Sequence, residues 1–214
     1  MAHAAHRFDT GVRRAWLLAV LAALLPAACT KQKPHPRGIV DRAWTEEVHL
    51  DDGSTVLVRR TARLNITNSW AGDAYNAVEL DASLAFMGQL AKLPAWHAPR
   101  IAMVLYRDPA NEEWVLVTTS TSCEIWERNG KPKPPYWEYR LKDTGWQPVP
   151  LSPASIGRPA NLLHLYDHEL PSLHITDVER EQLQGDKRIA RKYREVRGDP
   201  DTFVCGEGNL NKPR

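Results

Sequence analysis

Residues 123–151 read CEIWERNGKPKPPYWEYRLKDTGWQPVPL and contain the most regular strand pattern in the chain. Residues 137–142 alternate between apolar and charged side chains, which is the period of a β-strand with one covered face. The two faces are Trp137, Tyr139 and Leu141 against Glu138, Arg140 and Lys142. Asp143-Thr144-Gly145 then supplies turn residues, and prolines in the returning residues 146–151 confine that strand to an edge. We therefore predict a hairpin at the centre of a small β domain.

Two further hairpins flank this one on its N-terminal side. Asp52-Gly53 separates two strand-like runs, and a two-residue loop would pair Val48 with Leu57. Acidic pairs such as Glu46-Glu47 are then expected on a solvent-exposed face. Residues 101–106 and 114–119 are apolar and β-branched, which predicts a hairpin covered on both faces. Residues 82–93 fit both a strand and a helix, and the pattern leaves the two alternatives open.

The C-terminal part changes to helical patterning. Thr176 is followed three residues later by Glu179, which is the spacing of a capping box at a helix start. The predicted fold class is mainly β (α+β): a small antiparallel sheet or sandwich-like domain built from hairpins, with a short helical C-terminal segment.

The N-terminus has the features of an export signal. Arg13-Arg14 precede an apolar run of 11 residues, 15–25, which is too short to span a bilayer as a helix. Residues 26–29 read PAAC, and a cysteine after small residues resembles the lipidation site of a bacterial lipoprotein. Pro26 departs from that pattern, which prefers an aliphatic residue three positions before the cysteine. Ordinary secretion by cleavage near Ala28 and an uncleaved anchor are the alternatives to lipidation at Cys29.

These observations divide the chain and suggest a location. The predicted parts are a signal peptide at 1–28, a flexible linker at 29–43, one β-rich domain at 44–197 and a tail at 198–214. We expect a monomer held at the bacterial cell envelope by lipid on Cys29 and facing the periplasm. Thr30, in place of an aspartate, favours the outer membrane over the inner. A soluble periplasmic or secreted protein is the alternative.

The remaining cysteines are interpreted in that compartment. With Cys29 assigned to lipid, Cys123 and Cys205 are left, and two cysteines in an oxidising periplasm can form a disulfide. Such a bond would close a loop of about 80 residues and contribute roughly 4 kcal/mol through loop entropy. The alternative for Cys123 is a buried, small apolar side chain.

Three motifs support a family resemblance. Residues 44–54 (WTEEVHLDDGS), 130–136 (GKPKPPY) and 145–151 (GWQPVPL), together with the lipoprotein-like signal, resemble a group of exported proteobacterial lipoproteins. The resemblance covers roughly residues 40–195, although residues 61–98 show no correspondence. It implies a single exported module. The group has no established activity, so no functional residue is transferred from it.

Charge and motif content narrow the function classes. The chain from Cys29 onward has 25 basic and 25 acidic residues, which gives no electrostatic case for nucleic acid. Trp126, Tyr136 and Trp146 are candidates for an aromatic surface that binds a glycan or an envelope protein. We predict a non-catalytic binding or structural module without a cofactor.

The alternative function is a periplasmic metal-dependent hydrolase. It would use the segment from His164 to His174, in which His164, His168 and His174 are the candidate ligands. If residues 161–166 were a strand, His164 and His168 would lie about 13 Å apart, too far to share one ion. A loop of solvent-facing polar residues is therefore the preferred interpretation of this segment.

Overall fold

The computed structural model describes residues 37–68, 75–120, 122–164, 172–184 and 193–199. Two compact units divide the chain, Met1–His35 and Pro36–Arg214, and the described residues all belong to the second. The predicted signal peptide and Cys29 lie outside the described residues. Among the residues described, no helix is both long and apolar enough to span a membrane.

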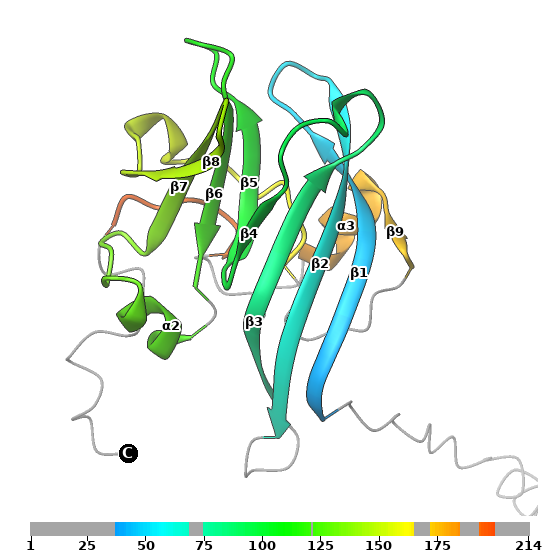
Figure 1. The fold of residues 1–214 in the computed structure, drawn as a ribbon, viewed down its shortest axis with the longest axis vertical. Coiled ribbons are helices and arrows are strands. Elements are labelled where there is room, and N and C mark those ends of the chain that lie inside the picture. The colour runs from blue at the N-terminus through cyan, green and yellow to red at the C-terminus, as the bar shows by residue number, and fades with distance from the viewer. Residues whose placement is uncertain (1–36, 69–74, 121, 165–171, 185–192, 200–214) are drawn as a thin grey trace, which may run out of the picture. The chain divides into compact units, whose positions relative to one another are not determined.

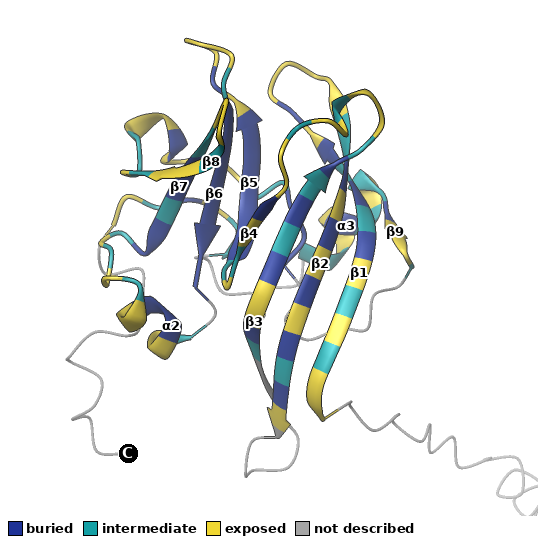
Figure 2. Cartoon of the chain, viewed as in Figure 1, coloured by how far each residue is buried: buried dark blue, intermediate teal, exposed yellow. Residues whose placement is uncertain are grey.

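The larger sheet contains three long antiparallel strands with a short strand at each border. Its strand order is β4-β3-β2-β1-β9, and β9 runs parallel to β1 (Figure 1). The bounds are Gly38–His49 for β1, Thr55–Asn68 for β2, Tyr75–Phe86 for β3, Trp96–Ala98 for β4 and His174–Ile175 for β9. On β2 every second residue from Val58 to Ile66 is buried, so this sheet covers one face and exposes the other (Figure 2).

The smaller sheet is a four-stranded antiparallel meander in chain order. Its strands are β5 (Ile101–Arg107), β6 (Trp114–Thr119), β7 (Tyr136–Lys142) and β8 (Gly145–Val149). Every residue of β6, and every residue of β5 except Arg107, is buried. The prediction that this hairpin is covered on both faces is therefore confirmed, as is the hairpin of β7 and β8.

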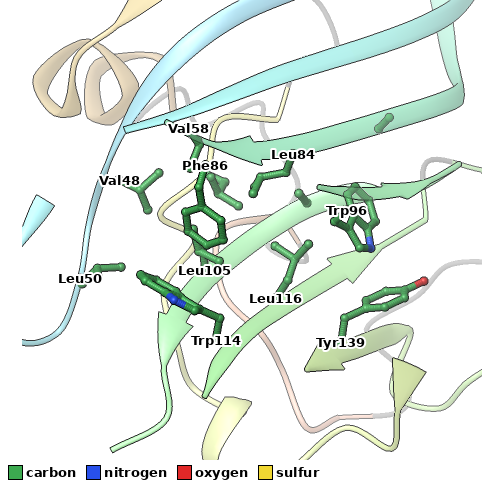
Figure 3. Packing of buried hydrophobic residues seen from close by; sticks show 13 residues of the cluster. Val48, Leu50, Val58, Leu84, Phe86, Trp96, Leu105, Trp114, Leu116 and Tyr139 are labelled. Atoms are coloured by element: carbon green, nitrogen blue, oxygen red, sulfur yellow. The ribbon is translucent and has the colours of Figure 1, made fainter. Parts of the chain in front are cut away.

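The main core lies between the facing sides of the two sheets. Val58, Leu84 and Phe86 from the larger sheet meet Leu105, Leu116 and Trp114 from the smaller one (Figure 3). The Phe86 and Trp114 ring centroids are 4.7 Å apart. Burying each aliphatic side chain of this size stabilises the fold by roughly 1.5–3 kcal/mol. The contacts between layers thus give the sandwich-like, mainly β fold that the sequence predicts.

Helices are short in the described residues. The α-helices are α2 (Cys123–Arg128) and α3 (Asp177–Gln184), and single 3-10 turns occupy Gly88–Leu90 and Pro153–Ser155. Thr176 and Glu179 form the predicted capping box: the Thr176 N–H donates to Glu179 Oε2 at 2.9 Å, and the Glu179 N–H donates to Thr176 Oγ1 at 3.3 Å.

Two sequence predictions require correction, and one open alternative is resolved. Strand β1 begins at Gly38, so residues 38–43 belong to the domain and not to a linker; they pair with β2 as far as Gly38 and Ile66. Strand β3 continues to Phe86, which assigns most of the ambiguous residues 82–93 to a strand and the 3-10 turn after it. The first hairpin pairs Val48 with Val56, one residue away from the predicted register.

Candidate binding site

An open depression of about 390 Å³ lies between two turns, the β1–β2 turn and the β5–β6 turn. Both turns lie at the same end of the two sheets, at the top of the view in Figure 1. The lining residues are Leu50, Asp51, Asp52, Arg107, Asp108, Pro109 and Glu112. Four of these residues have carboxylates and one has a guanidinium group, so the lining is predominantly acidic.

The first wall is a three-residue turn whose backbone is fixed by hydrogen bonds. The Leu50 N–H donates to the Ser54 carbonyl at 2.9 Å, and the Gly53 N–H donates to the Leu50 carbonyl at 3.0 Å. Gly53 has a φ of 81°, which a glycine adopts without steric cost. The extra loop residue explains the register correction. Hydrogen bonds from Ser54 to Asp52 lower the pKa of the Asp52 carboxyl.

The second wall is held by Asp108. Its Oδ1 accepts from the Ala110 N–H at 3.0 Å, and its backbone N–H donates to the Glu113 carbonyl at 2.8 Å. Arg107 pairs with Glu112 at 3.1 Å across the turn. The backbone bond from Ala110, followed by Arg140, lowers the pKa of Asp108. Asp108 therefore stays ionised at neutral pH.

A buried polar network lies behind this wall, and we call it the Glu138 network. Arg140 donates to Asp108 Oδ2 at 2.8 Å and to Glu138 Oε1 at 3.0 Å. Glu138 is fully buried, and Ser155 Oγ donates to its Oε2 at 2.8 Å. The Tyr106 hydroxyl lies 2.9 Å from Ser155 Oγ. These contacts satisfy a buried carboxylate that would otherwise be very costly to desolvate.

Arg158 joins the same network to the first wall. Its guanidinium lies 3.7 Å from the Tyr106 ring centroid and forms an ion pair with Asp51. Asp51 and Asp108, one from each wall, are thus linked to one set of contacts. Asp108 is thus held from the interior of the domain, whereas Asp51 is joined to the same contacts by a solvent-exposed ion pair.

A second buried ion pair joins strands β1 and β2 of the larger sheet, away from the depression. Arg60 Nη1 lies 3.3 Å from Glu46 Oε2, and both side chains are almost completely buried. The Glu46 carboxylate also accepts from the Leu163 N–H, while Arg60 donates to the Leu163 carbonyl. The prediction of an exposed face at Glu46 is therefore wrong, because the segment with Leu163 covers this part of the sheet.

Two further titratable groups lie in the core. Burial raises the pKa of Glu79 to about 8, which keeps its carboxyl protonated at neutral pH. Burial lowers the pKa of His164 to about 3, and its ring stacks on Tyr193 at 5.0 Å. The expectation that the segment of His164 faces solvent is wrong for His164 itself.

The candidate aromatic surface is not assembled. Trp126 and Tyr136 are both buried: Trp126 donates to the Pro132 carbonyl at 3.0 Å, and Tyr136 to the Glu195 carbonyl at 3.2 Å. Burial also raises the pKa of Tyr136 to about 12. Trp146 is half-buried and donates to the Pro94 carbonyl at 2.9 Å. Because two of the three rings are buried in separate surroundings, the prediction of a shared binding surface made of these residues is wrong.

The candidate metal ligands are not brought together among the described residues. His164 is buried, while His174 is exposed on β9, where its Nδ1 lies 2.8 Å from Thr45 Oγ1. His168 lies outside the described residues. Within the described ranges, no group of three or more His, Cys, Asp or Glu side chains has an arrangement that could hold a metal ion.

Cys123 opens helix α2 and is disulfide-bonded. Its predicted partner, Cys205, lies outside the described residues, so the identity of the bond's second cysteine stays a prediction.

Comparison of the chain with protein-family models, with curated proteins and with solved structures found no match. The resemblance to exported lipoproteins therefore stays a prediction. Sequence patterns did not indicate the depression or the Glu138 network. The local signal for the second wall is Asp108-Pro109, which by itself indicates only a turn.

Proposed function

We propose that this chain is a monomeric, exported envelope protein, lipid-anchored at Cys29 on the outer membrane, that works as a non-catalytic binding module. The disulfide at Cys123 supports export, because disulfides persist in oxidising compartments and are rare in the cytosol. The cysteine after small residues at the end of an apolar run supports the lipid anchor. The bound partner is an envelope protein.

The observation that supports binding most directly is the depression between two turns, each with a hydrogen-bonded backbone. A preorganised site loses less conformational entropy when a partner binds than a site made of mobile loops. Here backbone hydrogen bonds fix each turn, Arg140 of the Glu138 network holds Asp108, and Arg158 pairs with Asp51. A positively charged group, such as a lysine side chain of the partner, complements this lining.

The positions of the two residues with strongly shifted pKa values favour binding over catalysis. Glu79 and His164 have the raised and lowered pKa values that often mark catalytic acids and bases. Both lie in the core, near the buried Arg60, and neither lines the depression. Their pKa shifts follow from desolvation, which any buried ionisable group experiences.

A cationic peptide tests the site. The lipid-free mature chain, residues 29–214 with Cys29→Ser, is titrated with pentalysine at low ionic strength by calorimetry. The double variant Asp52→Asn/Glu112→Gln removes two exposed charges from the lining and keeps the shape of both side chains. At roughly 0.5–1 kcal/mol per exposed charge pair, we expect the double variant to bind about tenfold more weakly.

The matched control is Glu124→Gln/Glu127→Gln, which removes two exposed carboxylates from helix α2. This control should bind pentalysine as the parent chain does. An equal loss of affinity in both double variants would show that net charge alone attracts the peptide, and would refute the site.

A further inference from the structure

Arg100 is a partly exposed cation in the connection between β4 and β5. Its guanidinium lies over the Trp137 ring, 4.3 Å from the ring centroid. Its Nη2 donates to Asn129 Oδ1 at 2.7 Å, and its Nη1 donates to the Tyr139 hydroxyl. In the described part of the chain, the guanidinium therefore has uncharged partners and no carboxylate beside it.

These three partners come from separate elements and are themselves held in place. Asn129 is the C-cap of α2, where its Nδ2 donates to the Ile125 carbonyl at 2.6 Å. Trp137 and Tyr139 share one face of β7 and pack in the main core. Burial raises the pKa of Tyr139, so its hydroxyl is protonated at neutral pH. The guanidinium is thus oriented by its neighbours without being neutralised by them.

Donors outnumber acceptors around this guanidinium. Arginine has five N–H donors, and two of them reach an acceptor in the described residues. The Arg100 Nε and Trp96 Nε1 atoms are both buried and have no acceptor among those residues. The Trp96 and Tyr139 ring centroids are 5.7 Å apart (Figure 3). Burial also lowers the pKa of Arg100, because desolvation disfavours its charged form. A bound anion would supply the missing charge.

The number of charges indicates the kind of anion. One guanidinium balances a monoanion, and its planar N–H groups match the two oxygens of a carboxylate. A carboxylate belongs either to a peptide or to an acidic sugar. Sugars bind proteins largely through open aromatic faces, and one face of the Trp137 ring is already covered by the guanidinium. The arrangement therefore favours a peptide carboxylate.

We propose that Arg100 binds the carboxylate of a peptide ligand, in a site where Asn129, Trp137 and Tyr139 orient the guanidinium. Strand β5 separates this site from the depression, because it begins directly after Arg100 and ends at Arg107, which lines the depression. Its seven residues extend over about 23 Å at about 3.3 Å per residue. The carboxylate site goes beyond the proposed function and does not depend on it.

NMR titration tests the site with acetylglycine, which is one peptide unit that ends in a carboxylate. The protein is the isotopically labelled mature chain, residues 29–214 with Cys29→Ser, which includes the whole compact unit Pro36–Arg214. Acetylglycinamide, at the same ionic strength, is the matched neutral ligand. We expect acetylglycine to cause saturable shifts of the Arg100 Nε–H and Trp137 Nε1–H signals, and acetylglycinamide to cause none. In Arg100→Gln, the Trp137 signal should report affinity that is about tenfold weaker.

The matched control is Arg128→Gln, which removes an exposed cation of α2 that is paired with Glu124. This variant should bind acetylglycine as the parent chain does. Equal shifts with the two ligands, which the parent chain alone can reveal, or equal weakening in the two variants would overturn the proposal. Tighter binding of glucuronate than of acetylglycine would overturn the choice of a peptide carboxylate. Neither result would bear on the depression, which pentalysine tests separately.

Discussion

Glu79 and His164 are two core residues whose pKa values are displaced in opposite directions. Between pH 4.5 and about 8, the folded chain keeps a proton on Glu79 that the unfolded chain has released. The free energy of unfolding therefore falls as pH rises, by about 1.4 kcal/mol per pH unit. Between about pH 3 and 6.5 the unfolded chain binds the extra proton, on His164. There the free energy of unfolding rises with pH, and the two effects oppose each other from pH 4.5 to 6.5.

The Glu79→Gln variant tests this linkage at the alkaline side. From pH 6.5 to 8, of these two residues only Glu79 still differs in protonation between the folded and the unfolded chain. The free energy of unfolding of the wild type should therefore fall by about 2 kcal/mol over this range, and that of the variant should fall little. Urea unfolding at the two pH values measures the difference. If the free energy of unfolding changed equally with pH in the two proteins, Glu79 would not be protonated in the folded chain.

Glu46 makes a second residue-scale prediction. Glu46→Gln keeps the shape of the side chain but leaves the buried Arg60 guanidinium without its anion. We expect a loss of about 3–5 kcal/mol in the free energy of unfolding, because an uncompensated buried charge is strongly destabilising. The double variant Glu46→Gln/Arg60→Met should recover part of this loss. A single-variant loss below about 1 kcal/mol would show that the ion pair is dispensable.

At the scale of elements, the β1–β2 turn sets both the hairpin register and the first wall of the depression. Gly53→Ala places a Cβ at a φ of 81°, and nothing lies within 4 Å of that added atom, so the cost is purely conformational. We expect a loss of about 1 kcal/mol in the free energy of unfolding. Gly53→Asn is the matched variant, because asparagine tolerates this conformation, and it should lose less. Equal losses in urea unfolding would argue against the three-residue turn.

Strand period and turn residues predicted the elements well, but not the register or the covered faces. Alternation in residues 137–142 located β7 correctly. It could not show that Glu138 is buried, because a polar residue on a covered face has the same period as one in solvent. Likewise Asp52-Gly53 located the first turn, yet one additional loop residue changed every cross-strand pair.

At the scale of the whole molecule, the candidate site depends on contacts between residues far apart in the sequence. Asp51 in the β1–β2 turn meets Arg158 after strand β8, and Asp108 in the β5–β6 turn meets Arg140 on strand β7. No local pattern encodes these pairs, which explains why the depression was not predicted. The aromatic surface was predicted from local composition, and it was wrong because Trp126 and Tyr136 are buried, Trp126 against Pro132 and Tyr136 in a core cluster with strands β5 and β6.

The central claim is an envelope protein anchored through Cys29, and mass spectrometry of the mature N-terminus tests it most directly. The chain is expressed in a double-membraned bacterium, and the membrane fraction is compared for the wild type and Cys29→Ser. We predict acyl chains on an N-terminal Cys29 in the wild type, and release of the variant from the membrane. An unmodified N-terminus in the soluble fraction of the wild type would contradict the anchor.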